Sequence, residues 1–213
     1  MELTKPKKKT LTDRVHDGIL EMIIRNTTQD EIVFNESQLM EAFGVSKAPV
    51  REALVRLCSE GVLRIIPRYG YVVEKLTDRD EEDVIRMRIL LETEALKSNF
   101  SRIVPHRLDE IRAQIERSCA SADMDVWGIW EYNEEFHLML ASYGENQILT
   151  RFLGESLQIH KRIYARRWWR ERSSLNTRSD SAPHMRIYQA LCEGDLEAGM
   201  RVLRQDIASG CIT

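Results

Sequence analysis

The sequence contains no long hydrophobic run. No segment reaches the ~18 consecutive apolar residues of a membrane-spanning helix, so we expect no membrane span. The lysine cluster at 7–9 is not followed by an apolar stretch, which argues against a secretory signal. Cysteine is scarce and lacks Cys-x-x-Cys spacing, which favours free thiols in a reducing cytoplasm over disulfides or a zinc knuckle. The four cysteines are Cys58, Cys119, Cys192 and Cys211.

A large excess of one charge sign is also missing. The formal net charge is −3, and residues 1–76 hold 12 Lys and Arg against 11 Asp and Glu. Bulk charge therefore does not indicate a nucleic-acid partner, and the placement of individual cations has to decide. The tail residues Lys7, Lys8 and Lys9 fit either a solvated tail or a helper on DNA phosphates. The length of 213 residues suits one large or two small domains.

The first 76 residues predict three helices. Apolar residues at helical spacing predict the first helix across about 10–25, namely Leu11, Val15, Ile19, Met22 and Ile23. Asn35 is a plausible N-cap for a second helix that contains Leu39, Met40 and Phe43. Gly44 suits a left-handed helix end, and Ser46 suits the N-cap of a third helix with Pro49 in its first turn.

The third helix is predicted to have two distinct faces. Val50, Leu54 and Leu57 recur on one face, whereas Lys47 and Arg51 lie on another beside the small Ala48. A helix–turn–helix with a short, basic outer face fits the major groove of DNA. The alternative is a solvated helix that happens to carry two cations.

Two β-rich runs follow, at 62–66 and 71–75, and they flank Pro67-Arg68-Tyr69-Gly70. This pattern is typical of a hairpin, and Arg68 at its tip would reach a phosphate or a minor groove. Three helices followed by a basic hairpin predict a winged helix-turn-helix.

The string GVSKAPVREALVRLCSEGVLRIIPRYGYVV closely resembles the N-terminal domain of GntR-type bacterial transcription regulators. The resemblance covers about 10–75 and implies that Ser46, Lys47, Ala48 and Arg51 contact bases and phosphates, with Arg68 and Gly70 in the wing. Two positions depart from the family pattern. Lys47 replaces the usual Arg, which exchanges a bidentate fork for a point charge, and Ser37 stands where relatives often have Arg.

From 77 onward the pattern is helical. Thr77 precedes an acidic first turn, and Val84, Met87, Leu91 and Ala95 form one apolar stripe. Further helices are predicted at about 105–121, 125–142, 146–169, 184–193 and 195–210. We therefore expect a mainly α protein, with a winged helix-turn-helix at 1–76 and an all-α bundle of six or so helices at 77–213.

The second region resembles the FCD effector-binding domain of the FadR-like branch of the same regulators. The matching motifs are Arg88-x-x-x-Glu92, Asn133-x-x-Phe136-His137, Asn146, Pro183-His184, Ala190 and Gly194-Asp195. Many such domains hold a divalent metal with one Asp and three His. By resemblance those positions are Asn133, His137, His184 and Asp206, and this mixed set suits zinc, manganese or nickel. The alternatives are hydrogen-bonded interior histidines, or a metal-free pocket that binds a ligand directly.

Arg88 and His160 are the candidate effector-binding residues. By resemblance Arg88 faces the same cavity and would bind an effector carboxylate, and His160 would contact effector or replace a lost metal ligand. Arg88 could equally form an ion pair with Glu92 one turn away. The basic, aromatic run at 163–174 would be a helix end, with Trp168 or Trp169 packed into the core or a dimer face.

These patterns predict a cytoplasmic bacterial transcription regulator, acting as a repressor. A homodimer would bind a double-stranded DNA operator with an inverted repeat, and a small organic acid would modulate that binding. Two alternatives remain. One is an effector-independent dimeric DNA-binding protein, and the other is a metalloenzyme with a DNA-binding head, for which the sequence shows no general base or nucleophile motif.

Overall fold

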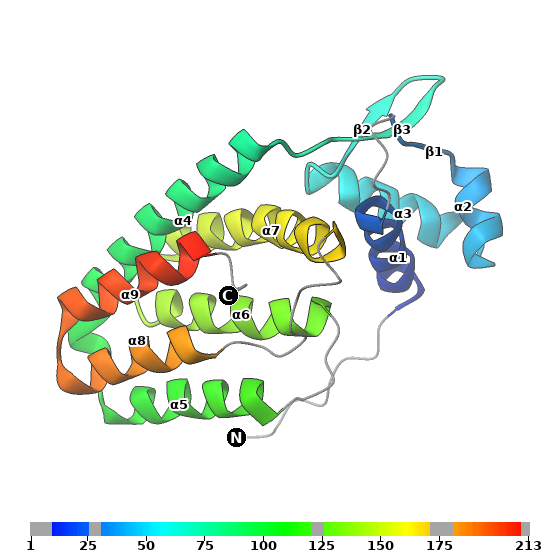
Figure 1. Cartoon of the computed structure of the whole chain (residues 1–213). Coiled ribbons are helices and arrows are strands. Elements are labelled where there is room, and N and C mark those ends of the chain that lie inside the picture. Colours follow the sequence, from blue (N-terminus) through cyan, green and yellow to red (C-terminus); the bar gives the residue numbers. More distant parts are fainter. Residues whose placement is uncertain (1–9, 26–30, 121–125, 171–180, 210–213) are drawn as a thin grey trace. The chain divides into compact units, whose positions relative to one another are not determined.

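A computed structural model of the chain describes residues 10–25, 31–120, 126–170 and 181–209. The chain divides into two compact units, Met1–Leu76 and Thr77–Thr213. Each unit is described by itself (Figure 1). None of the described helices is both long and apolar enough to cross a membrane.

The first unit contains three helices, α1 (Leu11–Arg25), α2 (Glu36–Phe43) and α3 (Lys47–Ser59). Its core joins Val15 and Ile19 of α1 to Leu39 of α2 and to Val50 and Leu54 of α3. The first helix was predicted correctly, but its apolar stripe was too wide. Leu11 and Met22 are 54% and 44% exposed, because the packed face of α1 runs through Val15 and Ile19.

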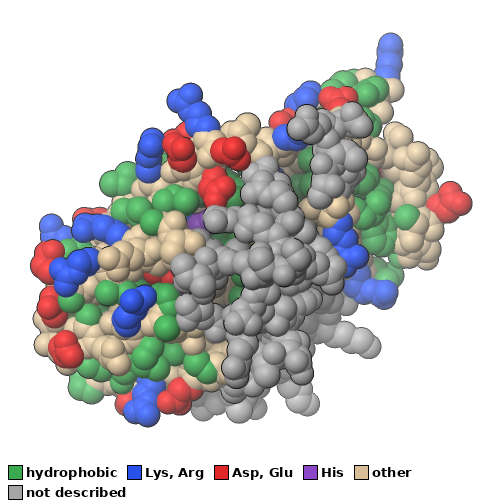
Figure 2. Space-filling model, in the orientation of Figure 1, with side chains coloured by type: hydrophobic (Ala, Val, Ile, Leu, Met, Phe, Trp, Pro, Cys, Tyr) green, Lys and Arg blue, Asp and Glu red, His purple; other side chains and the backbone are tan. Residues whose placement is uncertain are grey.

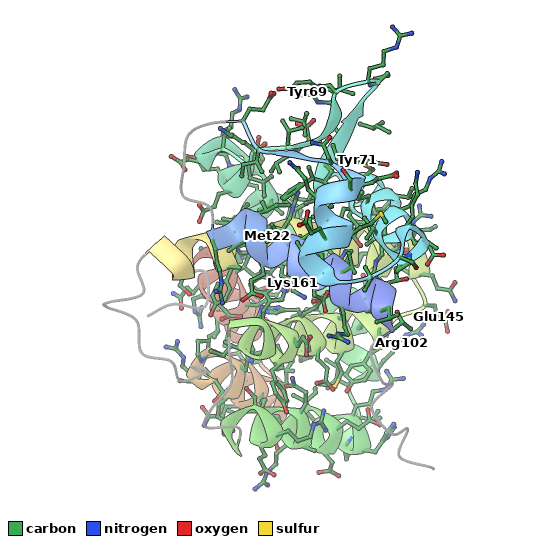
Figure 3. The ribbon with its side chains drawn as sticks, turned by 90° about the vertical axis from the view of Figure 1, so that its right-hand side faces the viewer. Met22, Tyr69, Tyr71, Arg102, Glu145 and Lys161 are labelled. Carbon is green, nitrogen blue, oxygen red and sulfur yellow. The ribbon has the colours of Figure 1, made fainter. Side chains whose placement is uncertain are left out.

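A three-stranded antiparallel sheet completes this unit, with the order β1-β3-β2. The predicted hairpin is formed by β2 (Leu63–Ile66) and β3 (Gly70–Val73). The strand β1 (Val33–Phe34) pairs with β3 and was not predicted, because two residues are too few to show a period. Figure 3 labels Tyr71 where the hairpin meets the helices and Tyr69 further out toward its tip. The unit is a winged helix, as expected.

The predicted helix ends are at the right residues, but two of them are held differently. Asn35 and Ser46 occupy the N-cap positions of α2 and α3, yet neither side chain makes a capping hydrogen bond. Gly44 ends α2 in the left-handed conformation with φ of 62°, as its sequence position indicated.

The described residues of the second unit are helical and contain no strand. A capping box between Thr77 and Asp80 fixes the start of its first helix. The helices are α4 (Asp78–Asn99), the short η1 (Phe100–Arg102), α5 (Pro105–Ala120), α6 (Val126–Ser142), α7 (Gln147–Arg170), α8 (Ala182–Glu193) and α9 (Leu196–Ser209). This is the predicted all-α bundle.

The buried face of α4 differs from the predicted stripe. Met87 is 49% exposed, whereas Arg88 and Glu92 are almost completely buried at 1% and 4%. The helix turns a polar face inward because α6, α7 and α9 all pack against it and bring polar side chains to meet it. Val84 and Ala95 of the predicted stripe are buried, but Met87 was wrongly assigned to the core because the prediction placed apolar residues there. The polar interior marks where the functional site has to be sought.

Candidate functional site

The exposed surface of α3 carries the residues that the sequence assigned to DNA. Ser46, Lys47, Ala48 and Arg51 are all exposed. On the opposite side, Val50, Ala53, Leu54 and Leu57 are fully buried in the unit's core. The helix is therefore two-sided as expected, with a short, polar outer face that its own unit leaves open.

Lys47 is not an isolated cation. Its Nζ lies 3.1 Å from Oε2 of Glu36, at the start of α2, and Oε1 of Glu36 accepts a hydrogen bond of 3.5 Å from the Tyr71 hydroxyl. Glu36 was not predicted from the sequence, because only the fold brings it beside Lys47. Arg51 is exposed and forms no ion pair with any residue that the structure describes. Of the two cations on the outer face of α3, Arg51 is therefore more available than Lys47 for contact with a partner.

Arg68 occupies a conformation that normally suits glycine. The Tyr69 N–H donates to the Ile66 carbonyl over 3.0 Å and closes the turn, in which Arg68 has φ of 67°. An L-residue pays roughly 1–2 kcal/mol for this left-handed conformation. The turn thus holds an exposed guanidinium at the tip of the hairpin, where a glycine would cost less.

Gly70 has a steric role in the wing. Its φ is 138°, and a Cβ added there would lie 2.8 Å from the Phe34 carbonyl oxygen. A side chain at this position would push β1 away from β3. The structure therefore explains glycine at 70 by the close approach of two strands.

Seven polar residues meet inside the second unit, and we call them the polar centre. They come from five helices, α4, α6, α7, α8 and α9, and each is at most 6% exposed. They are Arg88, Glu92, Asn133, His137, His160, His184 and Asp206. All four candidate metal ligands and both candidate effector residues are therefore buried together.

His137 lies at the middle of the polar centre. Its Nδ1 is 2.5 Å from Oε2 of Glu92, so Nδ1–H donates to that carboxylate. Its Nε2 lies 3.2 Å from Oδ1 of Asn133 and 3.2 Å from Oδ2 of Asp206. Burial opposes a charge on the ring, but the neighbouring Glu92 carboxylate raises the pKa of His137 above its ordinary value.

His184 approaches the same oxygen from another helix. Its Nε2 lies 3.6 Å from Oδ2 of Asp206, and its ring stacks on Phe136 with centroids 3.9 Å apart. Burial lowers the pKa of His184, which keeps the ring neutral. Burial alone would raise the pKa of Asp206, but the two histidines close to its carboxylate lower it well below its ordinary value, so the carboxylate is ionised.

The geometry at Asp206 fits a bound cation. One ligand atom each from His137, His184 and Asp206 lies within 4.8 Å of the others. Asp206 Oδ2 is nevertheless a buried atom with no well-aligned hydrogen-bond donor. When Nδ1 of His137 carries the ring proton, its Nε2 lone pair faces the Asn133 and Asp206 oxygens. Three acceptors then meet at one place, and a proton on Nε2 or a metal ion would satisfy them.

Arg88 forms the intrahelical ion pair with Glu92, which was one of the two alternatives, and it also contacts His160. Its Nε donates to Oε1 of Glu92 over 2.8 Å, and its Nη1 donates to Nδ1 of His160 over 2.7 Å. Because guanidinium is only a donor, Nδ1 of His160 accepts, and the neutral ring carries its proton on Nε2. The intrahelical ion pair is therefore itself part of the polar centre.

Glu92 is the member of the centre that sequence reasoning missed. It bridges Arg88 to His137 with its two oxygens, and hydrogen bonds and charge from both partners lower its pKa against the effect of burial. Its signal was the Arg88-x-x-x-Glu92 spacing, which also fits an exposed ion pair. Burial distinguishes the two and cannot be read from spacing alone.

Some predictions fall on parts that the structure does not describe. The lysines at 7–9 and Cys211 lie outside the described residues, as do the side chains of Trp168 and Trp169.

On the surface of the second unit, charges of both signs are mixed. Figure 2 shows Lys and Arg interleaved with Asp and Glu over the visible face of its helices.

Two family comparisons match the chain. Residues 83–209, more than half of the chain, match the family described as "FCD domain". Residues 11–73 match the family described as "Bacterial regulatory proteins, gntR family". The two matched ranges lie in the two structural units, one in each.

Individual proteins are similar over part of the chain. The HTH-type transcriptional regulator YdhC of Bacillus subtilis (strain 168) is 28% identical over 140 residues, which is 65% of this chain and 62% of YdhC. The gluconate operon transcriptional repressor of Bacillus licheniformis is 30% identical over 95 residues, 45% of this chain and 37% of the repressor. Both matches span less than two thirds of the relative's length.

A solved structure, E. coli McbR/YncC, has a similar fold. It superposes with a TM-score of 0.68 at 22% identity and covers 95% of both chains. At this identity the likeness shows the fold alone.

Proposed function

The chain belongs to the gntR family of bacterial regulatory proteins with an FCD domain, and from this we propose that it is a dimeric, ligand-responsive repressor of transcription. The observation that carries the proposal is the two-sided helix α3, with exposed Lys47 and Arg51 opposite a fully buried apolar face. Residues 1–76 would bind DNA, and residues 77–213 would bind effector and dimerise. The related domains and proteins are transcription regulators, so the chain is not an enzyme.

We assign the DNA contacts by charge and exposure. Arg51 would enter the major groove with Ser46 and Ala48 beside it, since short side chains allow the helix to approach the bases. Lys47 would contact a phosphate as a point charge, after exchanging its partner Glu36 for DNA. Arg68 at the wing tip would contact the backbone or the minor groove.

The polar centre would hold a divalent metal through His137, His184 and Asp206, with Asn133 as a fourth, neutral ligand. The Nε2 lone pairs and the Asp206 oxygen that lacks an aligned donor support this assignment. Mixed nitrogen and oxygen ligation suits zinc, manganese or nickel. The bound ion would supply positive charge to attract an anion. Glu92 would orient His137 by accepting its Nδ1–H.

The effector would be a small organic acid bound beside Arg88 and His160. Such a ligand changes DNA affinity only if it binds two conformations of the protein unequally. Repression is supported by two relatives that match part of this chain and are named as gluconate operon transcriptional repressors.

A second copy of the chain would cover an apolar surface on α4 and α7, which pack against each other. We call this the α4–α7 face. Its residues are about half exposed or more, and they are Met87, Leu90, Ile148 and Phe152. Four large apolar side chains on two adjacent helices are unusual for a surface that faces only water. A two-fold dimer would match an inverted-repeat operator.

One observation also favours an effector-independent dimeric DNA-binding protein. A protonated His137 would join Glu92 to Asp206 and satisfy most of the polar centre without a metal. Metal analysis of the purified protein, together with a thermal-shift screen of small carboxylates, would decide between the two proposals.

The DNA-binding proposal is tested with Arg51→Ala. Operator sequences would be selected from random DNA by the wild-type protein and titrated by fluorescence anisotropy. We expect at least tenfold weaker binding for Arg51→Ala. Arg79→Ala is the matched control, since it removes the same charge from an exposed position in the second unit. Equal affinity of Arg51→Ala and Arg79→Ala would contradict the assignment.

A further inference from the structure

Among the described residues of the second unit, Arg88 and Trp130 each hold a buried nitrogen donor without a hydrogen-bond partner. These donors are Nη2 of Arg88 and Nε1 of Trp130, and both side chains are 1% exposed. Arg88 commits Nε to Glu92 and Nη1 to His160, which leaves Nη2 as its remaining unpaired terminus. The indole of Trp130 has only this one polar hydrogen.

Both donors belong to the surroundings of His160. Arg88 contacts Nδ1 of that ring over 2.7 Å, and the Trp130 ring meets it edge-on with centroids 5.3 Å apart. Tyr164, one turn further along α7, packs on Trp130 at 5.1 Å. The helices α4, α6 and α7, which carry Arg88, Trp130 and His160, pack against one another.

Unpaired donors at this depth require an explanation. A buried N–H without a partner costs about 1–3 kcal/mol, and more when it is charged. Packing alone would be served equally well by phenylalanine at 130. Trp130 also shares a face of α6 with Asn133 and His137, which follow it at three and seven residues. The unpaired indole thus lies along the same helix face as the candidate metal ligands.

The charges of the polar centre select the kind of acceptor. Arg88 is positive, Glu92 and Asp206 are negative, and the histidines are neutral when they bind metal. A divalent cation therefore leaves one positive charge in excess. A buried excess charge is costly, and one anionic group would remove it.

We infer that Arg88 Nη2 and Trp130 Nε1 together receive one small monoanionic group of the carboxylate class, which makes Trp130 a ligand-binding residue. This inference rests on the metal and effector parts of the proposed function and adds a residue and a net charge to them. Without the metal the centre carries no excess positive charge, so anion binding depends on metal binding. A neutral amide of the same shape offers an oxygen but leaves the excess charge in place.

The test uses the full chain, loaded with zinc or treated with a chelator, and acetate as the probe. Acetate is expected to raise the melting temperature of the zinc-loaded protein, whereas acetamide at equal concentration does not. Trp130→Phe keeps the aromatic ring but removes the donor, and we expect about tenfold or greater loss of acetate affinity. Zinc affinity is expected to stay unchanged in this variant.

Tyr143→Phe is the matched control. It also removes one donor from a buried aromatic residue, but the Tyr143 hydroxyl bonds Glu110 and the Arg107 carbonyl, outside the polar centre. Its acetate affinity should equal that of the wild type. A loss of affinity in Trp130→Phe alone therefore reports the indole donor and not a general loss of packing.

Nuclear magnetic resonance separates a direct hydrogen bond from an indirect effect. The chain has four tryptophans, and the indole N–H signal that disappears in Trp130→Phe identifies Trp130. Acetate should move that signal downfield in the zinc-loaded wild-type protein and leave it in place in the chelator-treated protein.

The outcomes are distinct. Full acetate affinity in Trp130→Phe, or an indole signal that acetate does not move, overturns the inference while metal and effector binding stand. Equal effects of acetamide and acetate overturn the anionic class. Zinc binding without any carboxylate effect overturns the inference together with the effector proposal. If the wild-type protein does not bind zinc, the metal proposal is overturned as well. The DNA-binding proposal is tested by its own measurement and is not affected.

Discussion

Glu92 and His137 are joined by a 2.5 Å contact between a carboxylate oxygen and Nδ1, deep in the helical unit. This contact fixes the proton of His137 on Nδ1 and turns its Nε2 lone pair toward Asn133 and Asp206. Carboxylate partners of this kind orient a metal-binding histidine and increase its basicity. The proposed metal-binding role of His137 therefore depends on Glu92.

Glu92→Gln is expected to weaken zinc binding by about ten- to hundredfold, because the amide accepts the Nδ1 proton without a negative charge. Competition against a chromophoric chelator would measure this, after far-UV circular dichroism has shown that the helices are retained. Glu94→Gln is the control, since Glu94 is exposed and, within the described part of the chain, accepts a hydrogen bond from Ser98 outside the polar centre. An unchanged zinc affinity in Glu92→Gln would remove Glu92 from the metal site.

Asn133→Asp is expected to strengthen metal binding and to destabilise the metal-free protein. The new carboxylate is a better ligand than an amide, but without a cation it lies beside Asp206, itself close to His137. The melting temperature should therefore rise with zinc and fall with chelator, relative to the wild type. Asn146→Asp makes the same chemical change at an exposed position. If zinc and chelator change the melting temperatures of Asn133→Asp and Asn146→Asp equally, Asn133 is not a metal ligand.

Arg68→Gly is expected to stabilise the first unit while weakening DNA binding. Relief of the φ of 67° offsets the greater freedom of glycine in the unfolded chain, for a net gain of up to about 1 kcal/mol. Loss of a phosphate contact should reduce the salt dependence of DNA binding by about one ion. Arg64→Ala, on β2 away from the tip, is the control. A variant that is more stable and binds DNA fully would show that Arg68 has no role in binding.

The sequence predicted the architecture well because its signals were local. The Gly44 corner, the α3 stripe of Val50, Leu54 and Leu57, and the hairpin around Pro67 each depend on neighbouring residues. The strand β1 was not predicted, because its partner β3 lies 39 residues away along the chain, with Val33 paired to Val72. Local patterns specify elements, and long-range pairing of short segments leaves little trace in them.

The polar centre was predicted only in part, for a related reason. Spacing placed Asn133 and His137 on one helix face, and the structure brings His184 and Asp206 beside them. Helical periodicity, however, assigned Met87 to the core, whereas the structure buries Arg88 and Glu92 and exposes Met87. A polar interior inverts the usual rule for apolar stripes. Glu92 and Trp130 became visible only when burial and hydrogen-bond partners were known.

Leu90→Glu is expected to convert a dimer to a monomer, because Leu90 is 66% exposed at the α4–α7 face and a carboxylate would be buried there by a second copy. Size-exclusion chromatography with light scattering measures the mass. Val104→Glu is the control, as Val104 is another exposed apolar residue outside that face. An undiminished dimer in Leu90→Glu would place the interface elsewhere.

His16 should make the stability of the first unit depend on pH. Both of its ring nitrogens face carboxylates, Nδ1 at 3.1 Å from Asp17 and Nε2 at 2.8 Å from Glu60. Burial opposes the charge, but these hydrogen bonds raise the pKa of His16 above its ordinary 6.5. The pKa of Glu60 is correspondingly lowered from 4.5, again against burial.

The directions of the pKa shifts of His16 and Glu60 define the pH range in which this pair stabilises the first unit. The raised pKa of His16 stabilises the folded first unit. This contribution is fully present below pH 6.5 and is lost as the pH rises through the folded-state pKa of His16. The lowered pKa of Glu60 also stabilises the folded first unit. This contribution is present above pH 4.5 and is lost as the pH falls through the folded-state pKa of Glu60. His16→Gln should therefore destabilise most between about pH 4.5 and 6.5 and least near pH 9. Chemical denaturation followed by circular dichroism would measure this.

Tryptophan fluorescence gives an internal control for this experiment, because all four tryptophans lie beyond residue 76. The fluorescence transition reports the second unit and should not differ between His16→Gln and the wild type at any pH. If His16→Gln costs the same free energy at pH 5.5 and pH 9, the paired carboxylates do not stabilise a charged His16, and the ring acts only as a neutral hydrogen-bonding group in the contact between α1 and α3.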